Sequence, residues 1–336
     1  MILVSSAKRF IRTNFHALTH KNFRIFWLGQ CVSLIGTWMQ NVGQSWLVLS
    51  ITGSPYLLGL IGTFQFAPFM FFSLFAGVAV DRFPKKKIIL MTQVISMVLA
   101  LVLSYLVFSH QVLYWHIVVI AIILGITNTV DMPTRQSFVM EIAGKEDLMN
   151  AIALNSATFN LARIVGPAIG ALLIAYLGLG WCFLINGLSF IAVIYGLLQI
   201  KVKPYLRLNK IKLSVFKEIK DGLRYVHANP MIFETLMMVT VVGIFVFNFN
   251  VLIPVFTKDV LHLKEKTYGF LLSSLGLGSF AGAIIVSMKS KSGPKKMMLA
   301  GSSMIVALTL ILIGMSNQFY ITALLLTITR SEEHTS

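Results

Sequence analysis

Nine long apolar runs and the start of a tenth occupy most of this chain of 336 residues. A hydrocarbon core roughly 30 Å thick needs about 20 apolar residues per helix, which these runs supply. Only 12% of the residues are charged, about half the usual share of soluble domains, so a soluble fold could not cover itself with polar surface. The runs are too long and too uniformly apolar for a transmembrane β-barrel. We therefore predict an all-α membrane protein with spans at about residues 24–50, 56–80, 88–109, 114–137, 148–176, 181–200, 231–256, 267–288, 296–315 and from 319 onward.

A cationic turn at Gly77–Lys87 separates the second and third runs and orients the chain. Turns with this many lysines and arginines stay in the cytoplasm. With the N-terminus inside, the cytoplasmic segments hold 5, 4, 2, 8 and 4 Lys or Arg residues, 23 of the 28, whereas the outer loops hold 3. The net charge of +16 therefore indicates membrane topology rather than a nucleic-acid surface.

The two ends of the chain and its cysteines add little chemistry. Residues 1–4 are too short for a signal-peptide core, so the first span acts as an uncleaved anchor. Residues 330–336 interrupt the tenth run and look like the translation of a sequencing adapter, so we exclude them and expect a fragment that lacks its last helices. Cys31 and Cys182 lie in different spans without a pairing motif, and we expect both to be buried.

Two halves are visible along the chain. In the connecting segment, apolar residues recur at helical spacing between lysines and arginines, which predicts an amphipathic helix on the inner membrane surface. The stretch Gly282–Lys296 keeps the glycine, proline and cations of the Gly77–Lys87 turn but lacks its acid, two spans into the second half. We predict a cytoplasmic N-terminal segment (1–22), a six-helix bundle (23–200), a cytoplasmic linker (201–230), a partial second bundle (231–329) and the excluded tail (330–336).

Several motifs resemble the major facilitator superfamily. The turn reads Gly-x-x-x-Asp-Arg-x-x-Lys-Lys-Lys, which is similar to the signature between the second and third spans of that superfamily. The chain also resembles the branch of bacterial enterobactin exporters and macrolide efflux proteins, at residues 23–30, 38–42, 52–55, 131–136 and 155–163. The resemblance implies twelve spans in two six-helix bundles, of which about nine and a half are present here.

The fifth span contains Gly166-Pro167-Ala-Ile-Gly170, which resembles the motif of proton-coupled exporters in that helix. Pro167 removes a backbone donor and can bend the helix, and the glycines allow close helix approach. Ordinary helix packing explains the same residues equally well. The arginine that many proton-coupled members have early in the fourth span has no counterpart between Trp115 and Val130, so their account of proton coupling does not transfer to this chain.

Charges inside the bilayer are costly, roughly 2.5–3.5 kcal/mol each at the helix centre, and therefore mark functional positions. Arg163 lies near the midplane, where it should face the central cavity or pair with an acid. Asp131 and Arg135 share one helix face at a spacing of four residues, which predicts a local ion pair. Asp131 could carry a proton, but we favour an inner-gate network. Its predicted members are Gly77, Asp81, Arg82, Lys85, Lys86, Asp131 and Arg135.

Uncharged polar residues within the spans are candidates for a substrate cavity, because the first, fourth and seventh spans line the cavity in the fold that the chain resembles. Hydrogen bonding between helices is an equally good explanation for each of them. With Arg163, the predicted coupling or cavity residues are Gln40, Asn41, Gln44, Gln65, Asn128, Asn160, Asn248 and Asn250.

The sequence contains no enzyme constellation: no metal-spaced His or Cys cluster, no phosphate-binding glycine loop and no Ser–His–acid set. We expect no catalytic residue, no metal and no cofactor. The leading hypothesis is a monomeric, proton-coupled exporter of amphiphilic small molecules such as siderophores or drugs, in the bacterial inner membrane with its N-terminus inside. The alternatives are an uptake permease of the same fold and a membrane scaffold that does not transport.

Overall fold

The computed structural model describes residues 15–202, 224–245, 249–289 and 296–333, and within these ranges the chain is helical and contains no strand. A short 3₁₀ helix, η1 (His16–Thr19), precedes the first long helix. The long helices of the first half are α2 (Lys21–Thr52), α3 (Pro55–Arg82), α4 (Lys85–Phe108), α5 (Tyr114–Ala143), α6 (Leu148–Leu177) and α7 (Leu179–Gln199). The second half has α9 (Pro230–Phe245), α10 (Phe249–Val255), the π-helical turn η2 (Phe256–Val260), α11 (Glu265–Lys289), α12 (Lys296–Met315) and α13 (Phe319–Glu333).

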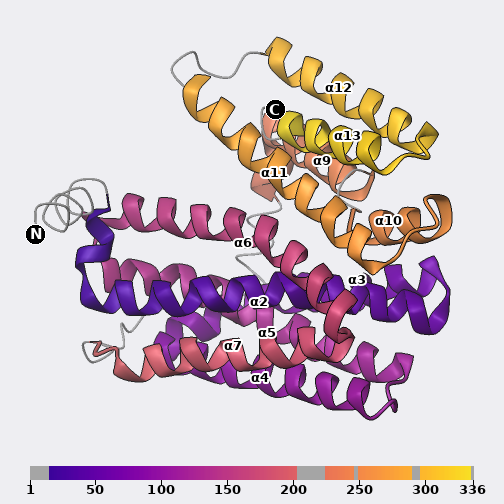
Figure 1. Ribbon diagram of the computed structural model, residues 1–336. Coiled ribbons are helices and arrows are strands. Elements are labelled where there is room, and N and C mark those ends of the chain that lie inside the picture. The colour runs from indigo at the N-terminus through magenta and orange to yellow at the C-terminus, as the bar shows by residue number, and fades with distance from the viewer. Residues whose placement is uncertain (1–14, 203–223, 246–248, 290–295, 334–336) are drawn as a thin grey trace, which may run out of the picture.

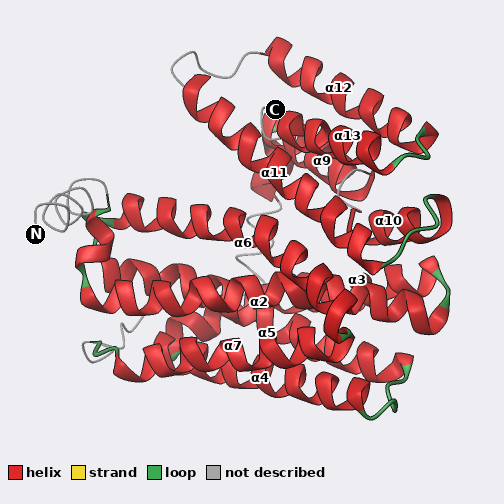
Figure 2. Cartoon of the chain, in the orientation of Figure 1, coloured by secondary structure: helices red, strands yellow, loops and turns green. Residues whose placement is uncertain are grey.

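The helices form two groups, α2 to α7 and α9 to α13, that meet along α6 and α11 (Figure 1). In the first group α2 packs against α6 and α7, α3 packs against α5, and α4 packs against both α5 and α7. Figure 2 shows that the connections between these helices are short. Helix α2 ends where Gly53 adopts a left-handed conformation with φ of 62°, which a glycine adopts at no steric cost.

The predicted all-α class is confirmed, and each predicted span contains a helix. Helix α5 continues to Ala143, beyond the predicted end at residue 137. The predicted seventh span contains α9 and α10, and residues 246–248 between them lie outside the described residues. Most of the predicted amphipathic linker helix lies outside the described residues. In its described part, residues 224–228 are helical.

Five of the described helical segments are long and apolar enough to cross a membrane, in α3, α4, α5, α6 and α7. Helix α2 is not among them although it has 32 residues. Its middle contains Ser, Thr, Asn and Gln residues, many of which are buried inside the bundle. A polar helix is tolerated at this depth because its neighbours, rather than lipid, surround its polar face.

Apolar clusters close both ends of the first bundle. One contains Phe23, Phe26 and Phe138, where α2 and α4 begin and α5 and α7 end. The other contains Leu47 and Leu103, where α2 and α4 end and α3 and α5 begin. A third cluster joins the two halves through residues of α2, α6, α10, α11 and α13. The polar centre of the first bundle therefore lies between two closely packed ends.

Candidate functional site

A cavity of about 990 Å³ lies within the first bundle, and the residues that line it come from α2 to α7. Its lining includes six glutamines, five asparagines and four phenylalanines. Only Asp131 and Arg135 among the lining residues are formally charged, so their charges cancel. The cavity therefore offers hydrogen-bonding groups and aromatic surface without an excess of either charge.

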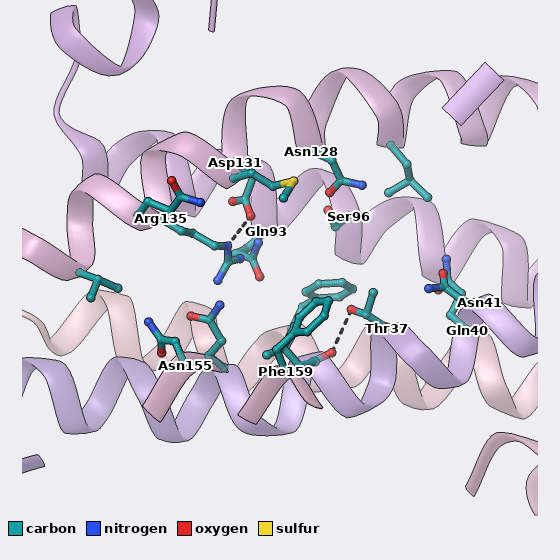
Figure 3. A pocket seen from close by; sticks show the side chains of 18 of the residues that line it. Thr37, Gln40, Asn41, Gln93, Ser96, Asn128, Asp131, Arg135, Asn155 and Phe159 are labelled. Carbon is teal, nitrogen blue, oxygen red and sulfur yellow. Dashed lines mark hydrogen bonds and ion pairs between the residues drawn. The ribbon is translucent and has the colours of Figure 1, made fainter. Parts of the chain in front are cut away.

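Helix α2 contributes a continuous polar stripe to this cavity. Gln30, Ser33, Thr37, Gln40 and Gln44 follow one another at intervals of three or four residues, which places them on one helix face. The Thr37 hydroxyl donates to the Ser33 carbonyl oxygen at 2.9 Å, within the helix. Figure 3 shows Thr37, Gln40 and Asn41 together at one side of the view.

The predicted ion pair between Asp131 and Arg135 is present: Arg135 Nε donates to Asp131 Oδ2. The Thr92 hydroxyl of α4 donates to Asp131 Oδ1 at 2.5 Å, so the carboxylate is held from two helices. Asp131 is buried, and both members of the pair line the cavity (Figure 3). The Arg135 guanidinium also lies 5.9 Å from the centre of the Phe26 ring. The pair therefore connects the cavity to the apolar cluster that contains Phe26.

The predicted cavity residues on α2 to α5 all line the cavity, but they differ in what they contact. Gln40 is buried, and its side-chain oxygen accepts a hydrogen bond of 2.6 Å from Asn186 of α7. Gln44 is buried as well, whereas Asn41 and Asn128 are exposed. The remaining member of this set is Gln65, which is partly buried. Gln40 thus connects two helices in addition to facing the cavity.

Arg163 is buried in α6 and does not line the cavity. Its Nη2 donates to Asn160 Oδ1 at 2.9 Å, and Asn160 does line the cavity. The backbone carbonyl of Arg163 faces Gly276 of α11. Arg163 therefore lies between the cavity and the contact with the second half. Of the two asparagines predicted on the seventh span, Asn248 and the side chain of Asn250 lie outside the described residues.

The predicted inner-gate residues do not all meet. Arg82 is exposed. A Cβ at Gly77 would have no neighbouring atom within 4 Å. Lys85 forms an ion pair of 3.3 Å with Glu141 of α5. Lys86 Nζ donates to the carbonyl oxygens of Ile200 and Leu198, at 2.8 and 3.4 Å. The side chain of Asp81 lies outside the described residues.

The Gly166-Pro167-Gly170 motif packs α6 against α2. A Cβ at Gly166 would lie 2.5 Å from the Cβ of Trp38, and one at Gly170 would lie 3.2 Å from the carbonyl oxygen of Met39. Pro167 lies inside α6, which bends along its length (Figure 1). The carbonyl oxygen of Pro167 faces Gly269 of α11. One helix therefore contacts both its own bundle and the second half through glycines.

Several lining residues were not predicted: Gln30, Gln93, Ser96, Gln136, Asn155, Phe159 and Asn186. Helical spacing could have found Gln30, because it lies on the face that Gln40 and Gln44 define. Ser156, which also lines the cavity, could have been found in the same way, because it lies four residues before Asn160. No comparable signal marked Gln93 and Asn186, because no other carboxamide lies within ten residues of either in the sequence. Within the described ranges, no three His, Cys, Asp or Glu residues are grouped so as to hold a metal ion.

Comparison with curated proteins finds bacterial transporters. The chain is 24% identical to the staphyloferrin A transporter of Staphylococcus aureus, over 78% of this chain and 66% of that protein. It is 21% identical to macrolide efflux protein A of Streptococcus pyogenes, over 88% of this chain and 73% of that protein. The enterobactin exporter EntS of Shigella flexneri is 25% identical, over 79% of this chain and 62% of that protein. The chain thus spans about two thirds of the length of these relatives.

Solved structures show the same fold. A bacterial homologue of the human lysosomal transporter Spinster, crystallised in an inward-facing and unoccupied conformation, superimposes with a TM-score of 0.69. The match covers 94% of this chain and 73% of that chain at 13% identity. A model of the transmembrane secretion effector family matches residues 12–331. The chain therefore belongs to the transmembrane secretion effector family of the major facilitator superfamily, a family of multi-pass membrane transporters rather than enzymes.

Proposed function

We propose that this protein exports an amphiphilic small molecule, such as a siderophore or a drug, across the bacterial inner membrane. The observation that supports this most is the cavity of the first bundle, with its eleven carboxamides and four phenylalanines. Small-molecule sites combine apolar and aromatic walls with convergent polar groups, and the many carboxamides here suit a ligand that is polar in part. Relatives that are a macrolide efflux protein and an enterobactin exporter favour export over uptake.

Transport would proceed by alternating access, in which the two halves rock about the contact of α6 with α11. That contact is built on glycines: Gly269 lies against Ala171 and the Pro167 carbonyl, and Gly276 lies against Ile164 and the Arg163 carbonyl. Smooth surfaces of this kind allow two helices to shift against each other without interlocking side chains. The cytoplasmic N-terminus follows from the excess of cations in the inner loops.

Proton antiport would supply the driving force. Asp131 is the carboxylate among the residues that line the cavity, and it is held by Arg135 and Thr92. Protonation of Asp131 would weaken the attraction to Arg135 and free that guanidinium at the inner end of the bundle. The ion pair would therefore open and close with the protonation of one residue, as part of the inner gate.

Uptake into inverted membrane vesicles tests this proposal, because export from the cell corresponds to accumulation in such vesicles. Vesicles from cells that express the protein should accumulate radiolabelled erythromycin when their interior is made acidic, and a protonophore should abolish the accumulation. Vesicles without the protein are the control. Accumulation that survives the protonophore would contradict proton antiport, and movement only in right-side-out vesicles would favour an uptake permease.

A further inference from the structure

Two buried carboxamide oxygens in the cavity lack a hydrogen-bond donor. Gln93 of α4 is 2% exposed, and its Oε1 has no partner in the described structure. Gln30 of α2 is partly buried, and its Oε1 is likewise buried without a partner. Both residues line the cavity. Figure 3 shows Gln93 on the same side as Asp131 and Arg135, which agrees with the hydrogen bond between the adjacent Thr92 and Asp131.

A buried carbonyl oxygen without a donor costs about 1–3 kcal/mol, and folded proteins pair nearly all such groups. The same cavity shows the usual arrangement at Gln40, whose oxygen accepts from Asn186. The protein therefore does not use its own donors for Gln93 and Gln30, although other carboxamides are close by. Both oxygens are closed to water in this conformation. Both side chains line the cavity, so a ligand bound there can supply the missing donor once a carboxamide turns toward it.

The charges of the cavity decide which kind of donor fits. An ammonium group would need a counter-charge when it leaves water, because a buried unpaired charge is far costlier than a buried dipole. The Asp131 carboxylate is already held by Arg135 and Thr92. A neutral hydroxyl or amide N–H needs no counter-charge and satisfies a carboxamide oxygen directly. Phe159 and Phe190 can cover the apolar part of the same ligand.

We propose that Gln93, with Gln30, is a specificity-determining acceptor that binds an uncharged hydroxyl or amide N–H of the transported molecule. This inference deepens the proposed function and rests on it in one respect, that the cavity binds the transported solute. It assigns to the substrate a neutral donor group in addition to an apolar body. One net hydrogen bond is worth about 0.5–1.5 kcal/mol, so removal of the donor should weaken binding roughly 2- to 13-fold.

The test compares a hydroxylated probe with its fully methylated ether, 3,4′,5-trihydroxystilbene and the corresponding trimethoxystilbene. Binding to the purified chain in detergent is measured by calorimetry, and the melting temperature of the free chain is measured in parallel. The wild type should bind the trihydroxy compound several-fold more tightly than the ether. Gln93→Leu should bring this ratio closer to 1, because only the Gln30 acceptor remains. Its melting temperature without ligand should be equal to or above that of the wild type, because an unpaired buried oxygen is lost. Gln199→Leu, an exposed residue outside the cavity, is the matched control and should keep the ratio.

Two results would overturn the assignment. A lower melting temperature for Gln93→Leu than for Gln199→Leu would show that Gln93 stabilises the fold. Equal affinity of the wild type for the two probes would show that Gln93 does not bind the donor group. An unchanged affinity ratio in Gln93→Leu would show the same. Failure of the proposed function has a different outcome: the trihydroxy compound binds with the expected ratio, but inverted vesicles with the wild-type protein do not accumulate it.

Discussion

The cavity of the first bundle and the two faces of α6 are built on opposite principles. In the cavity, Gln40 pairs with Asn186, but two other buried carboxamide oxygens have no donor. Along α6, backbones and small residues approach so closely that a Cβ at Gly166 or Gly276 would lie within 3.0 Å of neighbouring atoms. In the cavity, hydrogen-bonding groups remain available to a ligand, whereas along α6 the helices already fill the space between them. We therefore expect substitutions of unpaired cavity residues to be tolerated better than substitutions of the glycines along α6.

Gly166→Leu should have the largest effect. The new side chain would start 2.5 Å from the Cβ of Trp38 and 2.9 Å from the carbonyl oxygen of Ile35, so α2 and α6 would have to separate. Overpacking of this kind costs about 3 kcal/mol, and we expect a sharp loss of monodisperse protein and a lower melting temperature in detergent. Gly62→Leu is the control, because a Cβ there meets nothing within 4 Å. Equal behaviour of the two variants would mean that α6 can move away from α2 at little cost.

Gln40→Leu should destabilise the chain by about 2 kcal/mol, because the buried Nδ2 of Asn186 loses its acceptor. The comparison is with Gln93→Leu, the same substitution at a carboxamide whose oxygen has no partner. The melting temperatures of the two variants therefore measure the difference between a paired and an unpaired cavity carboxamide. The double replacement Gln40→Leu/Asn186→Leu should recover part of the loss. If Gln40→Leu is as stable as Gln93→Leu, the hydrogen bond to Asn186 contributes little.

Asp131 and Arg135 are best tested by a double-mutant cycle of Asp131→Asn, Arg135→Gln and the combined variant. Both side chains are mostly buried, so we expect a coupling free energy of about 1 kcal/mol, between the values of exposed and fully buried pairs. Thermal unfolding in detergent gives the stability part of the cycle, and erythromycin accumulation in inverted vesicles gives the transport part.

If Asp131 controls the inner gate, Asp131→Asn should abolish the dependence of accumulation on the pH gradient while the protein still inserts. Normal gradient dependence in Asp131→Asn would exclude it as the coupling residue. The transport readout therefore separates a gate from a pair that merely stabilises α5.

Local sequence patterns predict the helices of this chain well, because a membrane span is set by its own length and hydropathy. They also predict the ion pair of Asp131 with Arg135, since both residues lie on one helix at a fixed spacing. Helical spacing places Gln40 and Gln44 on one face of α2, and both line the cavity.

Contacts between helices were harder to predict. A carboxamide in an apolar run gives the same signal whether it pairs, as Gln40 does with Asn186, or lacks a partner, as Gln93 Oε1 does. The neighbouring helix decides between these outcomes, and that helix lies about 40 to 150 residues away in sequence, as the Thr92–Asp131 and Gln40–Asn186 hydrogen bonds show. The partners of Lys86 were missed for the same reason: the sequence shows a cationic residue, and only the packed helices show what it contacts.

Substitutions of the lysines in the Gly77–Lys87 turn should have the smallest effect on stability. They test whether these lysines stabilise the fold in addition to orienting the chain in the membrane. Lys85 pairs with Glu141 at a site where both side chains are partly exposed, and such pairs contribute about 0.2–1 kcal/mol and are screened by salt. Lys86 instead donates to carbonyl oxygens at the C-terminal end of α7, where a cation is favoured by the helix dipole at all but high salt.

We therefore expect Lys85→Gln and Lys86→Gln each to lower the unfolding free energy by about 0.5 kcal/mol at low salt, measured by thermal melting. Raising the salt should remove most of the difference for Lys85→Gln and less of it for Lys86→Gln, because hydrogen bonds to two carbonyl oxygens persist when charges are screened. Lys87→Gln, at an exposed position of the same turn, is the control. If all three variants melt like the wild type, neither the Lys85–Glu141 pair nor the hydrogen bonds of Lys86 stabilise the fold.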